Sequence, residues 1–137
     1  MICSYCQSEN DTLMENCTFC DAPLYKQRPQ LKEMVFVEHA ELPFGELSLF
    51  HTYDLLILLR LVREERSNSY KLMRDLQKGA ELIEVDKGLL SFTEQEYRLY
   101  TARMKVIEGI LIDRMGYRPK RVDDKLLASL KVKLEND

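Results

Sequence analysis

The sequence predicts a mainly α-helical protein, in which a small cysteine-bearing N-terminal unit precedes a bundle of three to four helices. Two observations support this fold class. All four cysteines fall within residues 1–24, and apolar residues recur at helical spacing from about residue 46 onward. A chain of 137 residues has room for one modest core. We therefore divide it into the unit at 1–24, a connector or extended segment at 25–45, and a helical domain at 46–137.

The cysteines form two C-x₂-C pairs separated by ten residues: Cys3 and Cys6, then Cys17 and Cys20. Two residues between the members of a pair let both thiolates of a tight turn reach one ion, and a second such turn completes a tetrahedron. Zinc prefers four sulfur ligands in closed structural sites. The spacing therefore predicts one structural zinc ion per chain.

Other uses of four cysteines are weaker explanations of this pattern. Iron also occupies four-thiolate cages and is the competing metal. Two disulfides would need an oxidising compartment, and the sequence shows no signal peptide. A thioredoxin-like redox centre needs one C-x-x-C beside a strand–helix pattern. We expect metal ligation in a cytoplasmic protein.

The two knuckles read CSYCQSEN at residues 3–10 and CTFCDAPL at residues 17–24. They resemble the short N-terminal zinc ribbons of many bacterial and archaeal proteins, whose second knuckle commonly reads F-C-x-x-C-G-A-x-L. The resemblance covers about a sixth of the chain and implies ligation by the four cysteines. The family has glycine after each knuckle, where this chain has Gln7 and Asp21. That glycine usually relieves a positive φ, which Asp tolerates better than Gln.

Charge is distributed unevenly between the two parts. Residues 1–24 hold four acidic and no basic residues, whereas residues 25–137 hold all 20 basic residues and 19 acidic ones. Four thiolates around a divalent ion add a further formal −2 to the ribbon. An acidic surface repels phosphate, so the ribbon is a poor candidate for gripping nucleic acid. We also expect no membrane association, because the longest apolar run, at 55–59, is far short of about 20 residues.

After a polar connector at 25–32, residues 34–37 are β-prone, and we expect an extended segment lying over the helical body. A helix is predicted from about Glu46, with Gly79 as its stop. Ser67-Asn68-Ser69 could break it into a loose helix-turn-helix, with Lys71, Arg74 and Lys78 on the exposed face of the second helix. One long helix with a solvated face is the better interpretation, because the turn lacks glycine.

A second long helix is predicted to follow a turn-bounded connection at 80–90. Thr93 and Glu96 form a capping-box pattern that places the start of the helix at Thr93, with Phe92 and Tyr97 spaced for a hydrophobic staple. Gly116 ends it. The apolar stripes of the two helices predict a core of Leu55, Leu58, Leu59, Val62, Tyr100, Met104, Ile107 and Leu111.

The C-terminal part is predicted to be a basic turn followed by an amphipathic helix. Asp123 and Asp124 suit the positive end of this helix. Its apolar face, either folded back on the body or offered to a partner, comprises Leu127, Leu130 and Leu134. The turn before it is the best patch for nucleic acid or an acidic partner, and comprises Tyr117, Arg118, Lys120 and Arg121.

Nothing in the sequence favours catalysis. It has no Ser/His/Asp arrangement and no phosphate-cradling glycine loop, and a closed four-sulfur site leaves no water to activate. A second, catalytic metal site at His39 and His51 lacks any H-x-x-x-H type spacing. We therefore expect a protein that is not an enzyme.

Two hypotheses for its role remain. In the first, the protein is an adaptor or small regulator that docks a protein partner, or a second copy of itself, through its helical surface and acidic ribbon. In the second, it is a nucleic-acid-binding regulator that uses the basic turn and the basic face of the first long helix. The acidic ribbon and the nearly neutral body favour the first.

Overall fold

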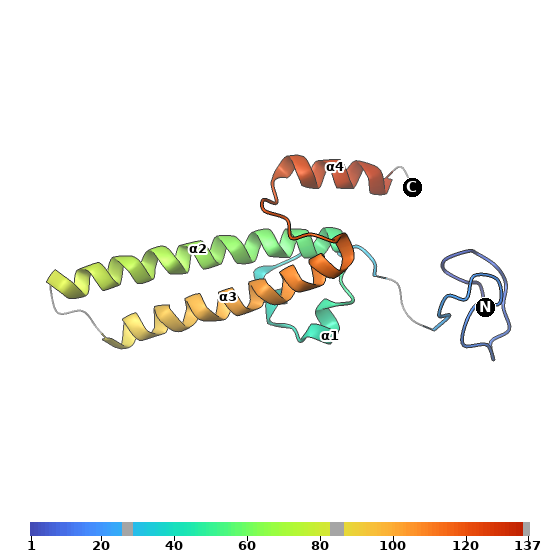
Figure 1. Cartoon of the computed structure of the whole chain (residues 1–137), viewed down its shortest axis with the longest axis horizontal. Helices are drawn as coiled ribbons and strands as arrows, with labels where there is room; N and C mark the ends of the chain where they lie inside the picture. Colours follow the sequence, from blue (N-terminus) through green and yellow to red (C-terminus); the bar gives the residue numbers. More distant parts are fainter. Residues whose placement is uncertain (26–28, 83–86, 136–137) are drawn as a thin grey trace. The chain divides into compact units, whose positions relative to one another are not determined.

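The computed structural model describes residues 1–25, 29–82 and 87–135 (Figure 1). The chain divides into two compact units, Met1–Gln30 and Leu31–Asp137. The first unit holds all four cysteines and the second holds all of the helices. Residues 31–45, which the sequence assigned to the connector, belong to the second unit. The rest of the predicted connector lies partly outside the described residues, at 26–28. Of the connection predicted at 80–90, residues 83–86 lie outside the described residues, and the others belong to the two long helices.

The second unit is built around two long antiparallel helices, α2 (Thr52–Leu82) and α3 (Lys87–Met115), which lie side by side (Figure 1). A 3₁₀ helix, η1 (Val37–Glu41), packs against both, and the short α1 (Phe44–Leu47) follows it. The last helix, α4 (Asp124–Glu135), packs on α2. The predicted mainly helical class is therefore confirmed.

The core lies between the two long helices and the segments that cover their shared end. Leu55, Leu58, Leu59, Val62, Ile107 and Leu111 have no exposed surface, and Tyr100 and Met104 are partly buried against them. The predicted core is thus confirmed. Consecutive aliphatic residues are buried on α2 because the helix is covered on several sides, by α3, η1 and α4. Val35 and Val37 pack on the same core, as expected for a segment lying over the body.

α2 is one continuous helix through residues 67–69, so the helix-turn-helix alternative does not apply. The predicted stop at Gly79 is wrong, because α2 continues to Leu82. A glycine inside a helix costs only about 1 kcal/mol, which packing beside α3 can offset. The predicted start at Glu46 is also wrong. The chain bends after α1, and α2 begins at Thr52 with the imidazole Nδ1 of His51 accepting the N–H of Tyr53 at 3.1 Å.

The predicted start of the second long helix at Thr93 is wrong as well. α3 begins at Lys87, and Thr93 is a buried residue inside it, where its hydroxyl donates to the carbonyl of Leu90 at 2.8 Å. Back-bonding of this kind satisfies a threonine within a helix without a cap. Phe92 is exposed and forms no staple. The predicted end is correct: Gly116 has φ +82, and its N–H bonds the carbonyl of Ile112 at 2.8 Å.

α4 folds back onto its own chain. Asp123 caps it by accepting the N–H of Leu126 at 2.9 Å, and Asp124 forms an ion pair with Arg60 of α2 at 2.6 Å. Leu127 is buried, whereas Leu130 and Leu134 are half-buried. This apolar face was expected either to fold back on the body or to meet a partner. The structure shows it folded back, because Leu127 and Leu130 contact the core.

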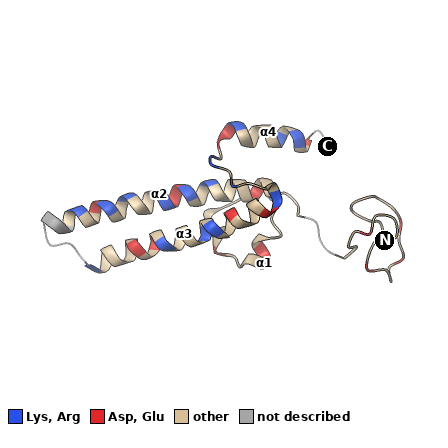
Figure 2. Cartoon of the chain, viewed as in Figure 1, with Lys and Arg blue, Asp and Glu red and all other residues tan. Residues whose placement is uncertain are grey.

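The charge distribution follows the sequence. Residues 1–24 include acidic residues and no basic ones, whereas acidic and basic residues both occur along the helices (Figure 2). Among the described residues, no helix combines the length and the apolar character needed to cross a membrane.

Candidate metal centre

The four cysteine sulfurs gather in one place in the N-terminal unit. All four Sγ atoms lie within 4.8 Å of one another, with Cys3 and Cys20 at 3.7 Å and Cys6 and Cys17 at 3.5 Å. A tetrahedron with metal–sulfur bonds of about 2.3 Å has sulfur–sulfur edges of about 3.8 Å. The donor set and its spacing therefore fit one metal ion. It is the only cluster of three or more ligating side chains in the part of the chain that the structure describes.

The two knuckles have the same backbone geometry, fourteen residues apart. The N–H of Gln7 bonds the carbonyl of Cys3 at 3.0 Å, and that of Asp21 bonds the carbonyl of Cys17 at 2.9 Å. In addition, the N–H groups of Tyr5 and Phe19 each lie 3.4 Å from the first sulfur of their own knuckle. Each tight turn thus aims backbone donors at a sulfur, which favours the thiolate form that binds metal.

Gln7 and Asp21, which stand where the zinc ribbons that this stretch resembles have glycine, adopt the conformation that glycine would. Gln7 has φ 65 and Asp21 has φ 64. The left-handed region costs a residue with a Cβ roughly 1–2 kcal/mol. Both knuckles close in spite of this cost, so the substitutions leave the ligand arrangement intact.

Asn10 joins the two knuckles and was missed by the sequence reasoning. It is buried, and its amide Nδ2 lies 3.4 Å from the Cys17 sulfur and 3.1 Å from the carbonyl of Ser8. Its Oδ1 accepts the backbone N–H of Thr18 at 2.9 Å and the Thr18 hydroxyl at 3.1 Å. Groups that contact metal ligands in this way fix their orientation. One asparagine among polar residues forms no pattern from which this role could be predicted.

Hydrogen bonds, burial and neighbouring sulfurs shift the pKa values of three of the four thiols. The backbone N–H of Cys20 lowers the pKa of Cys17 to about 6, against the effect of burial and with help from Asn10. The N–H groups of Cys6 and Tyr5 lower the pKa of Cys3. The N–H of Ala22 acts to lower the pKa of Cys20, but desolvation and the three neighbouring sulfurs raise it to about 12. Without a metal, the cluster therefore holds protons that a metal ion must displace.

The other predicted contact residues lie in two separate places. Tyr117, Lys120 and Arg121 are exposed in the turn before α4, and exposed Arg118 forms an ion pair with Glu108 at 3.5 Å. Lys71, Arg74 and Lys78 are exposed on α2. Arg63 of α2 contacts the turn by donating to the carbonyls of Pro119 and Lys120. Lys71 follows Arg63 by eight residues, about 12 Å along the helix, so the structure does not merge the two patches.

Neither histidine takes part in a metal cluster within the described residues. His39 Nδ1 accepts the backbone N–H of Phe36 at 2.9 Å, and His51 Nδ1 accepts that of Tyr53. Both side chains therefore stabilise local turns.

Fold and site together define a protein with one unit whose four cysteines are positioned to hold a metal ion and a separate helical unit. No family model, curated protein or solved structure matches this chain.

Proposed function

We propose that the protein is a non-enzymatic zinc-binding adaptor that docks a protein partner through its ribbon and its helical surface. One observation carries the proposal. Three large apolar side chains of the ribbon are exposed: Tyr5 by 50%, Phe19 by 80% and Leu13 by 88%. A unit this small that exposes several large apolar side chains favours a binding role, because monomeric proteins rarely leave much apolar surface uncovered.

Zinc is the metal proposed for the four-cysteine cage. A closed set of four thiolates with no open position suits a structural ion that organises a surface. Tyr5 and Phe19 occupy the same place in the two knuckles, directly before the second cysteine of each pair. Because each tight turn presents one of these rings, ligation by the neighbouring cysteine sets the position of the docking residues.

The helical unit offers a second surface of similar chemistry. A groove of about 430 Å³ is lined by Val35, Phe36, Val37 and Leu61 together with Glu38, Glu64 and Glu65. None of the three carboxylates forms an ion pair with another described residue. A groove lined by both apolar and acidic side chains and an acidic ribbon both favour a partner that presents apolar side chains together with Lys or Arg.

The exposed cations of the turn before α4 favour the second candidate function, nucleic-acid binding. Lys120 and Arg121 form no ion pair within the described residues, and Tyr117 is exposed beside them. Arg118, however, shares Glu108 with Arg63. The acidic ribbon also opposes phosphate. This candidate is therefore ranked second.

The test is association of the metal-loaded chain with proteins of its native host. Replacing both Tyr5 and Phe19 with Glu should eliminate the association, whereas the matched change of exposed Leu72 to Glu on α2 should not. Retention by the double variant would count against the ribbon surface. Tight, salt-sensitive binding of generic duplex DNA that disappears on charge reversal at Arg118, Lys120 and Arg121 would establish the second candidate instead.

A further inference from the structure

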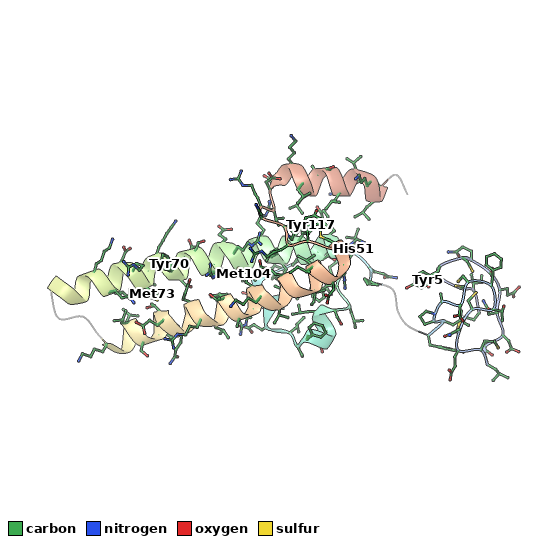
Figure 3. The ribbon with its side chains drawn as sticks, viewed as in Figure 1. Tyr5, His51, Tyr70, Met73, Met104 and Tyr117 are labelled. Carbon is green, nitrogen blue, oxygen red and sulfur yellow. The ribbon has the colours of Figure 1, made fainter. Side chains whose placement is uncertain are left out.

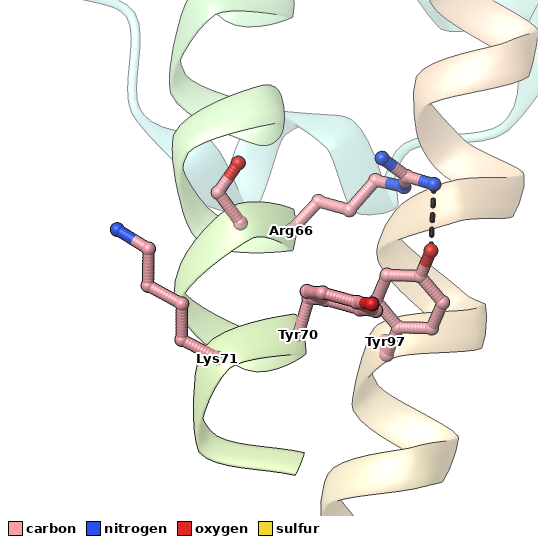
Figure 4. Close-up of a pocket in the computed structure, with 5 residues that line it drawn as sticks. Arg66, Tyr70, Lys71 and Tyr97 are labelled. Atoms are coloured by element: carbon pink, nitrogen blue, oxygen red, sulfur yellow. Dashed lines mark hydrogen bonds between the residues drawn. The ribbon is translucent and has the colours of Figure 1, made fainter. Parts of the chain in front are cut away.

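α3 carries apolar side chains on two faces, of which the inner one packs on α2. Met104 lies between the two long helices and contacts the core (Figure 3). Further along the same face, the Tyr97 hydroxyl accepts a hydrogen bond from Arg66 of α2 at 2.8 Å (Figure 4). A helix at the surface of a protein needs one apolar stripe to pack on its body. The apolar residues of the outer face therefore call for a different explanation.

The outer face has large apolar side chains at every seventh position. Phe92 is 57% exposed, Leu99 42% and Val106 39%, and Ala102 between the last two is also exposed. Seven residues turn a helix through about 700°, close to two full turns, so these side chains form one stripe about 21 Å long. A stripe with this repeat is typical of a helix that pairs with a second helix along its length.

The space over this outer stripe is open. The elements that pack most closely on α3 are α2 and η1. Gly109 continues the stripe three residues after Val106, and a Cβ added there would meet nothing within 4 Å. The small residues Ala102 and Gly109 thus leave holes between the larger side chains, into which side chains of a partner helix could insert.

One edge of the stripe is positively charged. Arg98 and Lys105 are exposed and directly precede Leu99 and Val106, so both lie on the same edge. Neither forms an ion pair with another described residue. The opposite edge has one residue of each sign, Glu96 and Arg103, and Arg103 is paired with Glu41 of η1 at 3.3 Å. The first edge therefore attracts acidic side chains.

These charges favour a different protein over a second copy of this chain. In a symmetric antiparallel pair of α3 helices, the same edge of each copy meets, so Arg98 would lie beside Lys105 of the second copy. A parallel pair would bring Arg98 beside Arg103. Like charges placed together across an interface disfavour association. A helix that has Asp or Glu beside its apolar residues has no such conflict.

We infer that the outer stripe of α3 docks an amphipathic helix of a protein partner, in which Asp or Glu flanks the apolar side chains. Phe92, Leu99 and Val106 contact the apolar side chains of that helix, and Arg98 and Lys105 pair with its carboxylates. The inference extends the docking role proposed above. It shares no residue with the ribbon surface or with the acidic groove, so each surface can be tested alone.

The test is a fluorescence-anisotropy titration of the full metal-loaded chain with a labelled synthetic peptide of about four heptads, a length that exceeds the stripe. The peptide has Leu at the two core positions of each heptad and Glu at the two flanking positions. Either orientation then places Glu beside Arg98 and Lys105, and repulsion keeps the peptides apart from one another. We expect saturable binding with a Kd of about 100 μM or tighter. Absence of saturable binding up to about 1 mM overturns the inference.

A neutral substitution in the stripe tests the apolar contact. Leu99→Gln removes an exposed apolar side chain and keeps a good helix former, so the helical circular dichroism should be unchanged. It should weaken peptide binding about tenfold, the effect of losing one well-packed apolar contact. The matched control is Leu72→Gln at an exposed position of α2, which should change the affinity less than about twofold. Equal effects of the two variants would refute the stripe as the docking surface.

Two double variants with the same net charge test the charged edge. Arg98→Glu with Lys105→Glu should weaken binding at least about tenfold, because it places like charges beside the peptide. Lys71→Glu with Lys78→Glu reverses two exposed cations of α2 and should weaken binding less than about threefold. Equal weakening by the two pairs would show unspecific attraction and overturn the inference.

Two controls separate this surface from the alternatives. The ribbon variant with Tyr5→Glu and Phe19→Glu should bind the peptide as the unmodified chain does. Loss of binding in that variant would place the peptide on the ribbon and overturn the inference, without affecting the function proposed for the ribbon. Sedimentation of the chain alone should show a monomer. A dimer that Leu99→Gln dissociates would identify a second copy as the occupant and would also overturn the inference.

Discussion

Glu108 holds three segments of the helical unit together, and its replacement by glutamine tests that role. Its side chain is 7% exposed on α3, with Oε2 lying 3.1 Å from Nη2 of Arg63 on α2 and 3.5 Å from Nε of Arg118 in the following turn. Glutamine keeps the size and shape of the side chain but removes its charge. The variant therefore isolates the electrostatic contribution.

The expected loss of stability is about 2–3 kcal/mol. Removing one partner of a buried ion pair costs about 3–5 kcal/mol, because the other charge is left uncompensated. Here Arg63 is 24% exposed and keeps its bond to the carbonyl of Pro119 at 2.7 Å, so part of that cost is recovered. For a unit of about 100 residues, 1 kcal/mol shifts Tm by about 4–8 °C. The helical unit of Glu108→Gln should therefore melt about 10–20 °C lower.

The assay is urea and thermal unfolding, followed by helical circular dichroism. The control is Glu41→Gln, which removes the same charge from the pair with Arg103, where Glu41 is 61% exposed and the distance is 3.3 Å. Exposed pairs contribute at most about 1 kcal/mol. Equal losses in the two variants, or a loss below about 0.5 kcal/mol for Glu108→Gln, would refute the reasoning from burial.

Four further predictions concern the core and the metal centre. Leu58→Ala, at a fully buried position, should cost about 2–5 kcal/mol in urea unfolding, whereas Leu72→Ala at an exposed position of the same helix should cost less than about 0.5 kcal/mol; similar values would show that the helix faces are misassigned. Cys17→Ser should unfold residues 1–24 while the helical circular dichroism persists, because the two units are separate; loss of both signals would show one cooperative unit. Protons compete with the metal for all four sulfurs, so metal bound at pH 7–9 should be released on acidification, and the hydrogen bonds that lower the pKa of Cys17 should favour its retention, measured with a chromophoric chelator; full retention at pH 4 would contradict this. Asn10→Ala removes a hydrogen bond that lowers that pKa, so the release curve should move to higher pH, and an unchanged curve would exclude this role for Asn10.

The parts of the fold that could be predicted from sequence are those set by periodicity. Aliphatic residues at helical spacing identified the buried faces of both long helices, as at Leu58 and Ile107. The end of α3 was also predictable, because Gly116 adopts a positive φ that few other residues accept. At the metal centre, the spacing of the cysteines was enough to predict that the four sulfurs lie close together.

The errors occurred at helix ends, where a local signal favoured a boundary that the chain does not use. Thr93 and Glu96 have a capping-box pattern, yet α3 begins six residues earlier, at Lys87. Gly79 is a residue type that commonly ends a helix, yet α2 continues past it to Leu82. The added turns at the start of α3 are mostly exposed, with Leu89 46% and Phe92 57% exposed, so the helix continues there through its own backbone hydrogen bonds. A glycine or a cap counts for only about 1 kcal/mol against them.

Other features could not be predicted because they join residues far apart in the chain. Arg63 and Glu108 are separated by 45 positions, and Arg66 and Tyr97 by 31. Charged and aromatic residues on helices are common, and only the hairpin register shows which of them meet. Asn10 is similar on a smaller scale, since its contact with Thr18 depends on how the two knuckles pack.

The most direct test of the central claim, a zinc ion held by four cysteines, is the metal content of the purified chain. Elemental analysis should find about one zinc per chain, and substitution with cobalt should produce the absorption of a tetrahedral four-thiolate site. A matched Cys6→Ser sample should lose most of its zinc. Less than half an equivalent of zinc together with a Cys3–Cys20 disulfide, or a full equivalent of iron in its place, would contradict the account.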